Sequence, residues 1–163
     1  MRGLSEPAGI ITFPGVNGYT QDLDKRLPYD VDAAKKLLAD AGYPKGFDVE
    51  LRCPNDRYVN DEAICTAVVG MLGKIGVNVN LFAQTKSKHF KELKEDKGDF
   101  YMLGWGVPTL DSHYVFHYLY ESGASWNKVN FSNSEVDAAI RVMEGEVDLD
   151  KRNAAIANAW KIV

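Results

Sequence analysis

Apolar and polar residues along the chain follow two spacings, one typical of strands and one typical of helices. Apolar and polar side chains alternate over 47–53 and again over 77–82, which predicts two half-buried strands. The mostly apolar segment 100–105 predicts a third strand, of the kind found at the centre of a sheet. Apolar residues at helical spacing predict helices over about 30–41, 60–75, 86–95, 134–144 and 149–162.

The order of these elements predicts the fold class. Strands that alternate with helices favour an α/β fold, in which a layered domain has a mostly parallel sheet flanked by helices. Residues 1–29 are rich in glycine and proline and are expected to form an extended arm. The remaining residues, 30–163, are then predicted to form a single α/β lobe, which suits a chain of this length.

The charge balance and the absence of long apolar runs narrow the function classes. The formal net charge is −4 at pH 7, so the chain lacks the basic surface expected of a nucleic-acid-binding protein. No apolar run reaches the roughly 18 residues of a membrane span, and the first seven residues show no apolar core of a signal peptide. Because the chain opens on a Gly/Pro-rich loop and stops within a helical pattern, we expect a fragment of a longer protein.

The cysteines and two of the histidines raise the question of metal binding. Cys53 and Cys65 lack the paired spacing of a zinc site, so they are either buried free thiols or, in an oxidising compartment, a disulfide. His113 and His117 stand four residues apart and could share a helix face, as metal ligands can. No third ligand is evident in the sequence, so packing is their expected role, and neither a metal nor another cofactor is predicted.

Three loops, 54–60, 83–87 and 104–112, follow the predicted strands. In open α/β sheets, ligands bind outside the carboxyl ends of the strands, so these loops are the candidate ligand-binding regions. In the first loop, Arg57 offers a planar guanidinium that can pair with a carboxylate through two hydrogen bonds; a surface salt bridge is the alternative.

The third candidate loop combines glycines with a large aromatic face. Glycine lets the backbone approach a ligand closely, and Trp105 can pack or stack. Asp111 could cap the next helix or meet a cationic group of a ligand. Together, the two loops supply the predicted ligand-binding residues Arg57, Tyr58, Asn60, Trp105, Gly106, Val107, Pro108, Thr109 and Asp111.

Catalytic motifs are weak in this sequence. It contains neither the Gly-x-Ser-x-Gly turn of hydrolases nor a phosphate-binding P-loop, and no catalytic residue is predicted. Two alternatives to ligand binding stay open. One is a small α/β enzyme with its site in loops 54–60 and 104–112, and the other is a protein-interaction module that uses the aromatic stretch 113–120.

Several segments together resemble one known family. Residues 27–47, 73–79 and 100–106, with the later positions 136–137 and 150–152, look like corresponding parts of the peptide-type solute-binding proteins of ABC importers. That family includes dipeptide-, oligopeptide- and nickel-binding proteins. The combination is specific, although each motif alone is not, and it extends over nearly the whole chain.

The resemblance implies a function and a location. Members of the family close two lobes over a small-molecule or peptide solute and deliver it to an ABC permease, and this chain resembles only the second lobe. The resemblance therefore implies a non-enzymatic, monomeric binding protein in the periplasm or another extracytoplasmic space, without nucleic-acid binding or membrane insertion of this segment. A missing signal peptide is what an excised segment would show.

Of two ligand-binding positions known from the family, this chain matches one and departs from the other. Arg57 stands where dipeptide binders place an arginine that pairs with the carboxylate of the ligand. Pro108 stands where peptide binders place an aspartate that holds the amino terminus of the ligand. Proline has neither a charge nor an N–H group, so this anchor is missing or is supplied by another residue.

Overall fold

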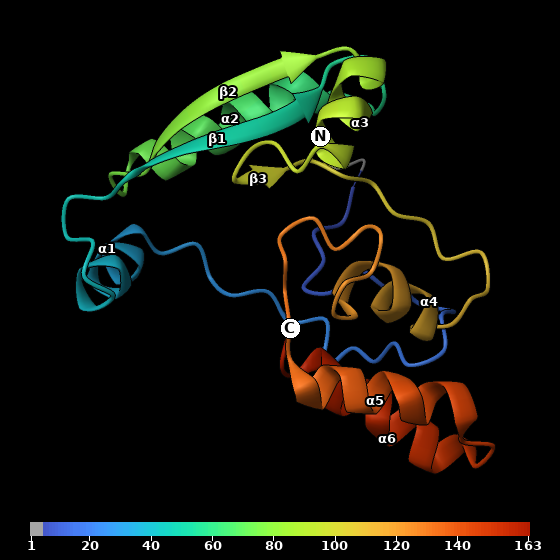
Figure 1. The fold of residues 1–163 in the computed structure, drawn as a ribbon. Coiled ribbons are helices and arrows are strands. Elements are labelled where there is room, and N and C mark those ends of the chain that lie inside the picture. Colours follow the sequence, from blue (N-terminus) through green and yellow to red (C-terminus); the bar gives the residue numbers. More distant parts are fainter. Residues whose placement is uncertain (1–4) are drawn as a thin grey trace. The chain divides into compact units, whose positions relative to one another are not determined.

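The computed structural model describes residues 5–163, which form two compact units (Figure 1). The sheet unit is Pro28–Gly104, and the helical unit combines the residues up to Leu27 with Trp105–Val163. The boundaries of these units differ from the predicted arm at 1–29 and lobe at 30–163. Residues 1–4, which belong to the predicted arm and to the segment searched for a signal peptide, lie outside the described residues.

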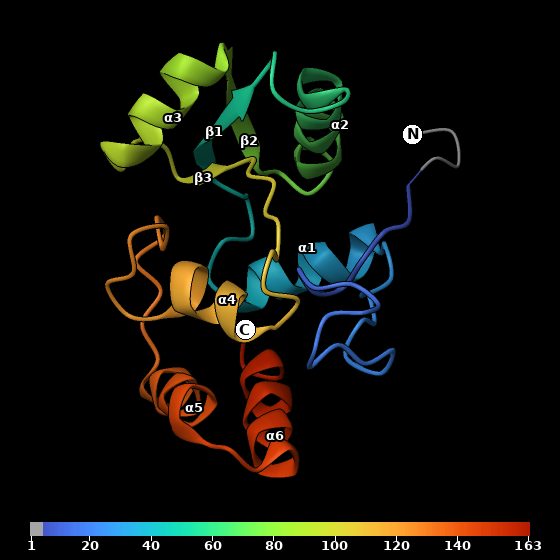
Figure 2. The same ribbon diagram turned by 90° about the vertical axis from the view of Figure 1, so that its right-hand side faces the viewer.

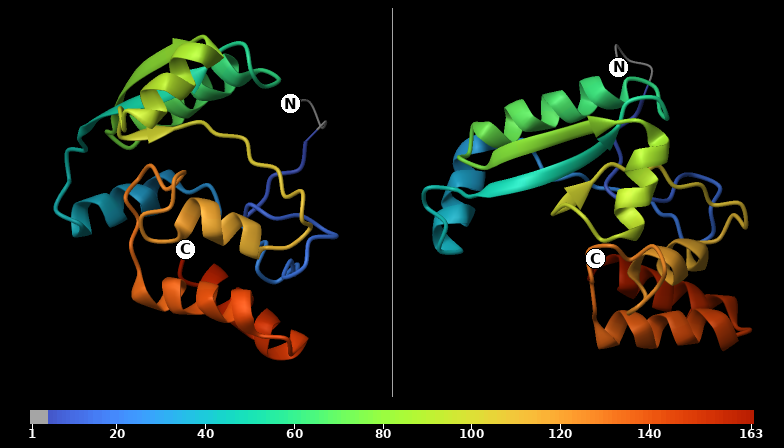
Figure 3. Two further views of the ribbon diagram at one scale, coloured as in Figure 1. Left: turned by 45° about the vertical axis from the view of Figure 1, so that its right-hand side comes forward. Right: turned by 45° about the horizontal axis from the view of Figure 1, so that its top comes forward.

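The sheet unit contains a small parallel sheet. Its strands β1 (Asp48–Pro54), β2 (Asn78–Gln84) and β3 (Phe100–Tyr101) are arranged in the order β2-β1-β3, and both neighbouring pairs are parallel. Helices α2 (Asp61–Gly73) and α3 (Lys86–Lys94) lie on opposite sides of this sheet (Figures 2 and 3). The predicted α/β fold class with a mostly parallel, helix-flanked sheet is therefore confirmed.

The third strand is shorter than the predicted segment 100–105 and lies at an edge of the described sheet, while β1 is central. Met102 donates one further hydrogen bond, from its N–H to the carbonyl of Arg52 at 2.9 Å. At Gly104 the N–H donates to the hydroxyl of Tyr58 instead, at 2.9 Å, so a loop side chain replaces the neighbouring strand as its partner.

Helix α1 (Val31–Asp40) begins where the sequence predicts it, because the side chain of Asp30 accepts a hydrogen bond from the N–H of Ala33 at 2.9 Å. No residue of this helix is fully buried, and Leu37 is 68% exposed. In α2 only Asp61 and Cys65 are buried, so the predicted core stripe of that helix is also only partly covered. Helical spacing identified these helices correctly but did not determine how much of each apolar face is buried.

A disulfide joins Cys53 of β1 to Cys65 of α2, with sulfur atoms 2.12 Å apart. Both cysteines are buried and pack with Leu51 in the core of the sheet unit. Of the two alternatives left open by the sequence, the structure therefore has the disulfide.

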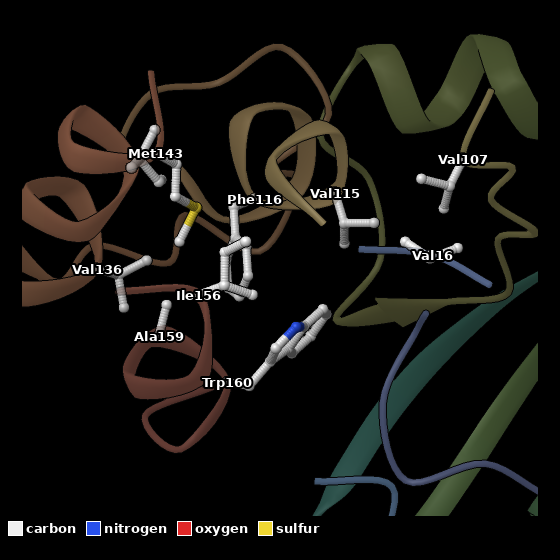
Figure 4. Close-up of a cluster of buried hydrophobic side chains, with 10 residues drawn as sticks. Val16, Val107, Val115, Phe116, Val136, Met143, Ile156, Ala159 and Trp160 are labelled. Carbon is white, nitrogen blue, oxygen red and sulfur yellow. The ribbon is translucent and has the colours of Figure 1, made fainter. Parts of the chain in front are cut away.

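The described part of the helical unit contains four helical segments: α4 (His113–Val115), the π-helical turn η1 (Phe116–Tyr120), α5 (Ser134–Gly145) and α6 (Leu149–Trp160). Asn133 and Asp148 cap α5 and α6 by accepting N–H groups of their first turns. The core between these segments contains Phe116 packed on Trp160, with ring centroids 4.4 Å apart (Figure 4).

The N-terminal segment is part of this unit. Val16 lies in the same core (Figure 4), and Asn17 exchanges backbone hydrogen bonds with Leu110 and Ser112 at 2.8 and 3.0 Å. Gly18 has φ +86°, and a Cβ atom there would lie 2.4 Å from Cγ2 of Ile156. Only glycine suits this position, which explains one glycine of the predicted arm.

Candidate functional site

The loop after β1 is organised by a buried carboxylate. Oδ2 of Asp61 accepts the N–H groups of Arg57 and Tyr58 at 2.9 and 3.0 Å, and Oδ1 accepts that of Glu62 at 2.9 Å. These hydrogen bonds, above all that from Tyr58, hold the pKa of Asp61 below its ordinary value. Asn60 precedes the helix in a left-handed conformation, with φ 58°, and its side chain makes no capping hydrogen bond. Asp61 rather than Asn60 therefore fixes the loop.

The guanidinium of Arg57 is presented to solvent at this end of the sheet. The residue is exposed, and its Cζ lies 5.3 Å from the ring centroid of Tyr58. Among the described residues, no carboxylate lies close enough to the guanidinium of Arg57 to form an ion pair. The surface salt bridge considered as the alternative is thus not found in the described part of the chain, and the guanidinium is available to an external anion.

Tyr58 ties this loop to the segment that follows β3. Its hydroxyl accepts the N–H of Gly104, and a Cβ atom on Gly104 would lie 2.7 Å from Cε1 of the tyrosine ring. Glycine therefore permits the close approach of this ring to the backbone. The structure thereby gives Tyr58 a positioning role within the sheet unit.

Trp105 lies in a half-buried aromatic cluster of the helical unit. Its ring centroid is 6.0 Å from those of Tyr114 and Tyr118 and 5.9 Å from that of Trp126. Its Nε1 is shielded from solvent and has no hydrogen-bond partner among the described residues. The tryptophan thus offers part of an aromatic face and one unused N–H donor.

The next four predicted positions differ in what they can offer a ligand. Val107 is 5% exposed and belongs to the core of the helical unit, so its side chain packs inward. Gly106, Pro108 and Thr109 are exposed. Any contact of Val107 with a ligand would therefore have to come from its backbone.

Asp111 is held by several protein groups. Its carboxylate pairs with both terminal nitrogens of Arg152 at 2.7 and 2.9 Å, accepts from Nδ2 of Asn17 at 3.0 Å, and accepts the N–H of His113, the first residue of α4, at 2.9 Å. Burial raises the pKa of Asp111, but the hydrogen bonds from Arg152, His113 and Asn17 outweigh it, and the net pKa is lowered. These contacts give Asp111 a structural role, and they involve residues too distant in sequence for the pattern to reveal.

The nine predicted ligand-binding residues fall into two groups. Arg57, Tyr58 and Asn60 belong to the sheet unit, and the six from Trp105 to Asp111 belong to the helical unit. Within the sheet unit, the parallel strands do place the loop after β1 and the start of α3 at the same edge: Asn55 donates to the carbonyl of Gln84 at 2.9 Å, and Asp56 accepts the N–H of Lys86. A single ligand site shared by both groups stays a prediction.

Comparison with known proteins decides the family. The sequence profile of the bacterial extracellular solute-binding proteins, family 5, middle part, matches residues 1–127. This chain belongs to that family. The resemblance found in the sequence is confirmed, and the described residues contain no helix long and apolar enough to cross a membrane.

Two curated relatives show how much of a family member the chain represents. The heme-binding protein A of Haemophilus influenzae is 28% identical over 158 residues, which cover 92% of this chain and 28% of the relative. The dipeptide-binding protein of Escherichia coli is 29% identical over 134 residues, which cover 80% of this chain and 25% of the relative. The chain thus spans about a quarter of the length of these family 5 proteins.

Solved structures of similar proteins support the fold. The periplasmic binding protein AgaA, in complex with agropinic acid, superposes with a TM-score of 0.87 and 24% identity. The match covers 99% of this chain and 33% of the AgaA chain. The DppA protein of Helicobacter pylori, in complex with the peptide STSA, matches 91% of this chain and 29% of its own with a TM-score of 0.80 and 23% identity. Both are ligand-binding proteins, and the likeness to them establishes the architecture.

Proposed function

We propose that this chain forms part of a ligand-binding lobe of an extracytoplasmic solute-binding protein, which captures a peptide-like or other small solute for import by an ABC permease. Its membership of family 5 supports this, and so do relatives named as dipeptide-, glutathione- and heme-binding proteins. Because the chain spans about a quarter of such proteins, the rest of the binding cleft would come from further residues of a longer protein.

The observation that carries this proposal is the exposed guanidinium of Arg57 at the carboxyl end of β1. It has no carboxylate partner among the described residues, and its backbone N–H is fixed by Asp61. A guanidinium pairs with a carboxylate through two parallel hydrogen bonds, which gives direction as well as affinity. We therefore assign Arg57 the carboxylate of the solute, and Tyr58 the support of the loop that presents it.

The residues of loop 104–112 restrict which charged groups of the solute this chain can bind. Pro108 has no charge and no N–H, and Asp111 is already paired with Arg152. Neither residue is suited to hold the ammonium group of a free peptide. The proposed solute therefore has a carboxylate that Arg57 recognises, and any cationic group on it must be bound by other residues.

We propose a binding role without catalysis, in the periplasm or another extracytoplasmic space. The relatives named above are binding proteins rather than enzymes. The Cys53–Cys65 disulfide supports the location, because disulfides persist in oxidising compartments and are rare in the cytosol.

The role of Arg57 can be tested by substitution in the proposed longer protein. We expect Arg57→Ala to weaken the binding of a carboxylate-bearing solute by at least about 30-fold, since the loss of one partner of a hydrogen-bonded charge pair costs about 2 kcal/mol or more. Arg57→Lys should recover only part of the affinity, because an ammonium lacks the planar fork. Isothermal titration calorimetry with dipeptides, each with a free and an amidated carboxyl end, provides the measurement.

Lys45→Ala serves as the control, because Lys45 is exposed and precedes β1, at the opposite end of the strand. This variant should bind as the unchanged protein does. Equal affinity of the Arg57→Ala variant and the unchanged protein for every carboxylate ligand would show that Arg57 has no such role.

A further inference from the structure

A cluster of nitrogen and oxygen donors in the helical unit has no part in the proposed solute site. His113 belongs to α4, His117 to η1 and Glu144 to α5, and one donor atom of each lies within 4.8 Å of the others. The two imidazole rings stack, with centroids 5.5 Å apart and planes inclined by 23°. The sequence showed only the histidine pair, because the third group comes from a different helix, far along the chain.

Carboxylate oxygens lie close to one nitrogen of each imidazole ring. Nε2 of His113 is 3.4 Å from Oε1 of Glu144, and Nδ1 of His117 is 3.9 Å from the same oxygen. Glu121, one helical turn after His117, adds a second carboxylate, with Oε2 2.8 Å from Nδ1 of that histidine. The cluster thus contains two imidazole nitrogens and two carboxylate groups.

These contacts do not give either nitrogen a well-aligned hydrogen bond. Both are shielded from solvent, and neither makes a hydrogen bond with suitable geometry among the described residues. A shielded polar atom without a well-aligned hydrogen bond is unfavourable, because it has lost its hydrogen bonds to water and its contact with a carboxylate replaces them only in part. A metal ion between the rings and the carboxylates would provide that missing interaction.

We propose that His113, His117 and Glu144, with Glu121 as the fourth donor, form a binding site for a divalent transition-metal ion of the Zn²⁺ type. Two imidazoles and two carboxylates are ligands that Zn²⁺ accepts in tetrahedral geometry, whereas Mg²⁺ and Ca²⁺ prefer sites made of oxygen alone. With metal–ligand distances of about 2.0–2.2 Å, neighbouring donors of a tetrahedral site are about 3.3–3.6 Å apart. The 3.4 Å separation in this cluster fits that spacing, and those of 2.8 and 3.9 Å lie on either side of it. The three donors of His113, His117 and Glu144 span up to 4.8 Å, so a bound ion would draw them closer together.

The two carboxylates that would have to move toward the ion belong to partly exposed side chains. The side chains of Glu144 and Glu121 are 45% and 35% exposed, so they can rotate without disturbing the core, and an ion can enter from solvent. Turns of π-helix such as η1 often occur at functional sites. A bound ion would link the segment 113–121 directly to α5.

Titration of the 163-residue chain with ZnCl₂ alone, followed by calorimetry, tests the proposal. We expect one equivalent of Zn²⁺ to bind and MgCl₂ to give no binding. His113→Gln and His117→Gln should each weaken Zn²⁺ binding by more than about tenfold, because even the loss of an outer-shell partner of a metal ligand costs 10- to 100-fold. Glu144→Gln should also weaken it.

Glu135→Gln is the matched control, because Glu135 is another exposed glutamate of α5 outside the cluster, and this variant should bind Zn²⁺ unchanged. Zn²⁺ should also raise the Tm of the unchanged chain but not that of the His113→Gln, His117→Gln double variant, since binding to the folded state stabilises it. Circular dichroism establishes that each variant is folded.

The proposal would be overturned by a folded chain that binds no Zn²⁺, in which case the cluster is an ordinary set of His–Glu contacts. It would equally be overturned by a double variant that binds Zn²⁺ as tightly as the unchanged chain. Neither result bears on Arg57, so this test and that of the proposed function can fail independently.

Discussion

At the scale of single residues, burial distinguishes two ion pairs of the same charge type, one local along a helix and one between residues 41 positions apart. Lys36 and Asp40 pair on the surface of α1, with side chains 75% and 59% exposed. Asp111 and Arg152 pair through two hydrogen bonds, with side chains 23% and 15% exposed. Exposed pairs contribute little to stability, but the removal of one partner of a shielded pair leaves the other charge uncompensated.

Asp111→Asn should therefore lower the free energy of unfolding by about 2–3 kcal/mol at pH 7, since hydrogen bonds to charged groups contribute about 1.5–3 kcal/mol. The pKa of Asp111 is lowered in the folded state, so its contribution is fully present above the pKa of the unfolded carboxyl, about 3.9, and is lost as the pH falls below it. Urea denaturation of both proteins between pH 7 and pH 3 measures the difference, which should shrink toward the acidic end.

Asp40→Asn is the matched control, and it should change the unfolding free energy much less. A loss for Asp111→Asn no larger than that of the control, or one that stays constant down to pH 3, would contradict the structural role of Asp111.

At the scale of the elements, the disulfide compensates for a small core. Among the described residues, the buried cluster of the sheet unit consists of Leu51, Cys53 and Cys65, and α1 buries no residue. The apolar residues packed against this cluster are only partly buried: Val68, Val79, Leu81, Phe100 and Met102. A covalent link between β1 and α2 restricts the unfolded chain where few apolar side chains hold the helix to the strand. The stability of the sheet unit should therefore depend on this bond.

Replacement of both cysteines by alanine should lower the free energy of unfolding by about 2–3 kcal/mol, the effect expected for closing a loop of this length. Thermal unfolding of the variant and of the unchanged chain, each with and without a reductant, gives the measurement. The reductant should destabilise the unchanged chain and leave the variant as it was. If complete reduction of the disulfide left the Tm of the unchanged chain the same, this role would be excluded.

At the scale of the whole molecule, the chain is a small part of the proteins that it matches. It covers 28% of the heme-binding relative and 25% of the dipeptide-binding relative, while nearly all of its own length is matched in the solved structures. Since we propose that the rest of the cleft comes from further residues of a longer protein, a ligand would find only part of its contacts here.

We therefore expect the isolated 163-residue chain to bind dipeptides with a dissociation constant no tighter than about 1 mM, which corresponds to about −4.1 kcal/mol. Calorimetry on the folded chain measures this, with the longer protein under the same conditions as the comparison. Tight binding to the isolated chain would show that the cleft is complete within these residues.

The sequence by itself determined the fold class, the family and the order of the elements, apart from the short helical segments α4 and η1. The spacing of apolar residues and the identity of capping residues are local features of the sequence. They predicted α1 with its cap at Asp30 and the two long parallel strands. Tertiary structure decided what depends on distant residues: the early end of β3, the disulfide, the pairing of Asp111 with Arg152, and the approach of Glu144 to the two histidines. The physical reason is that spacing along the chain fixes which residues share a strand or helix face, whereas packing alone brings together groups that lie far apart in sequence.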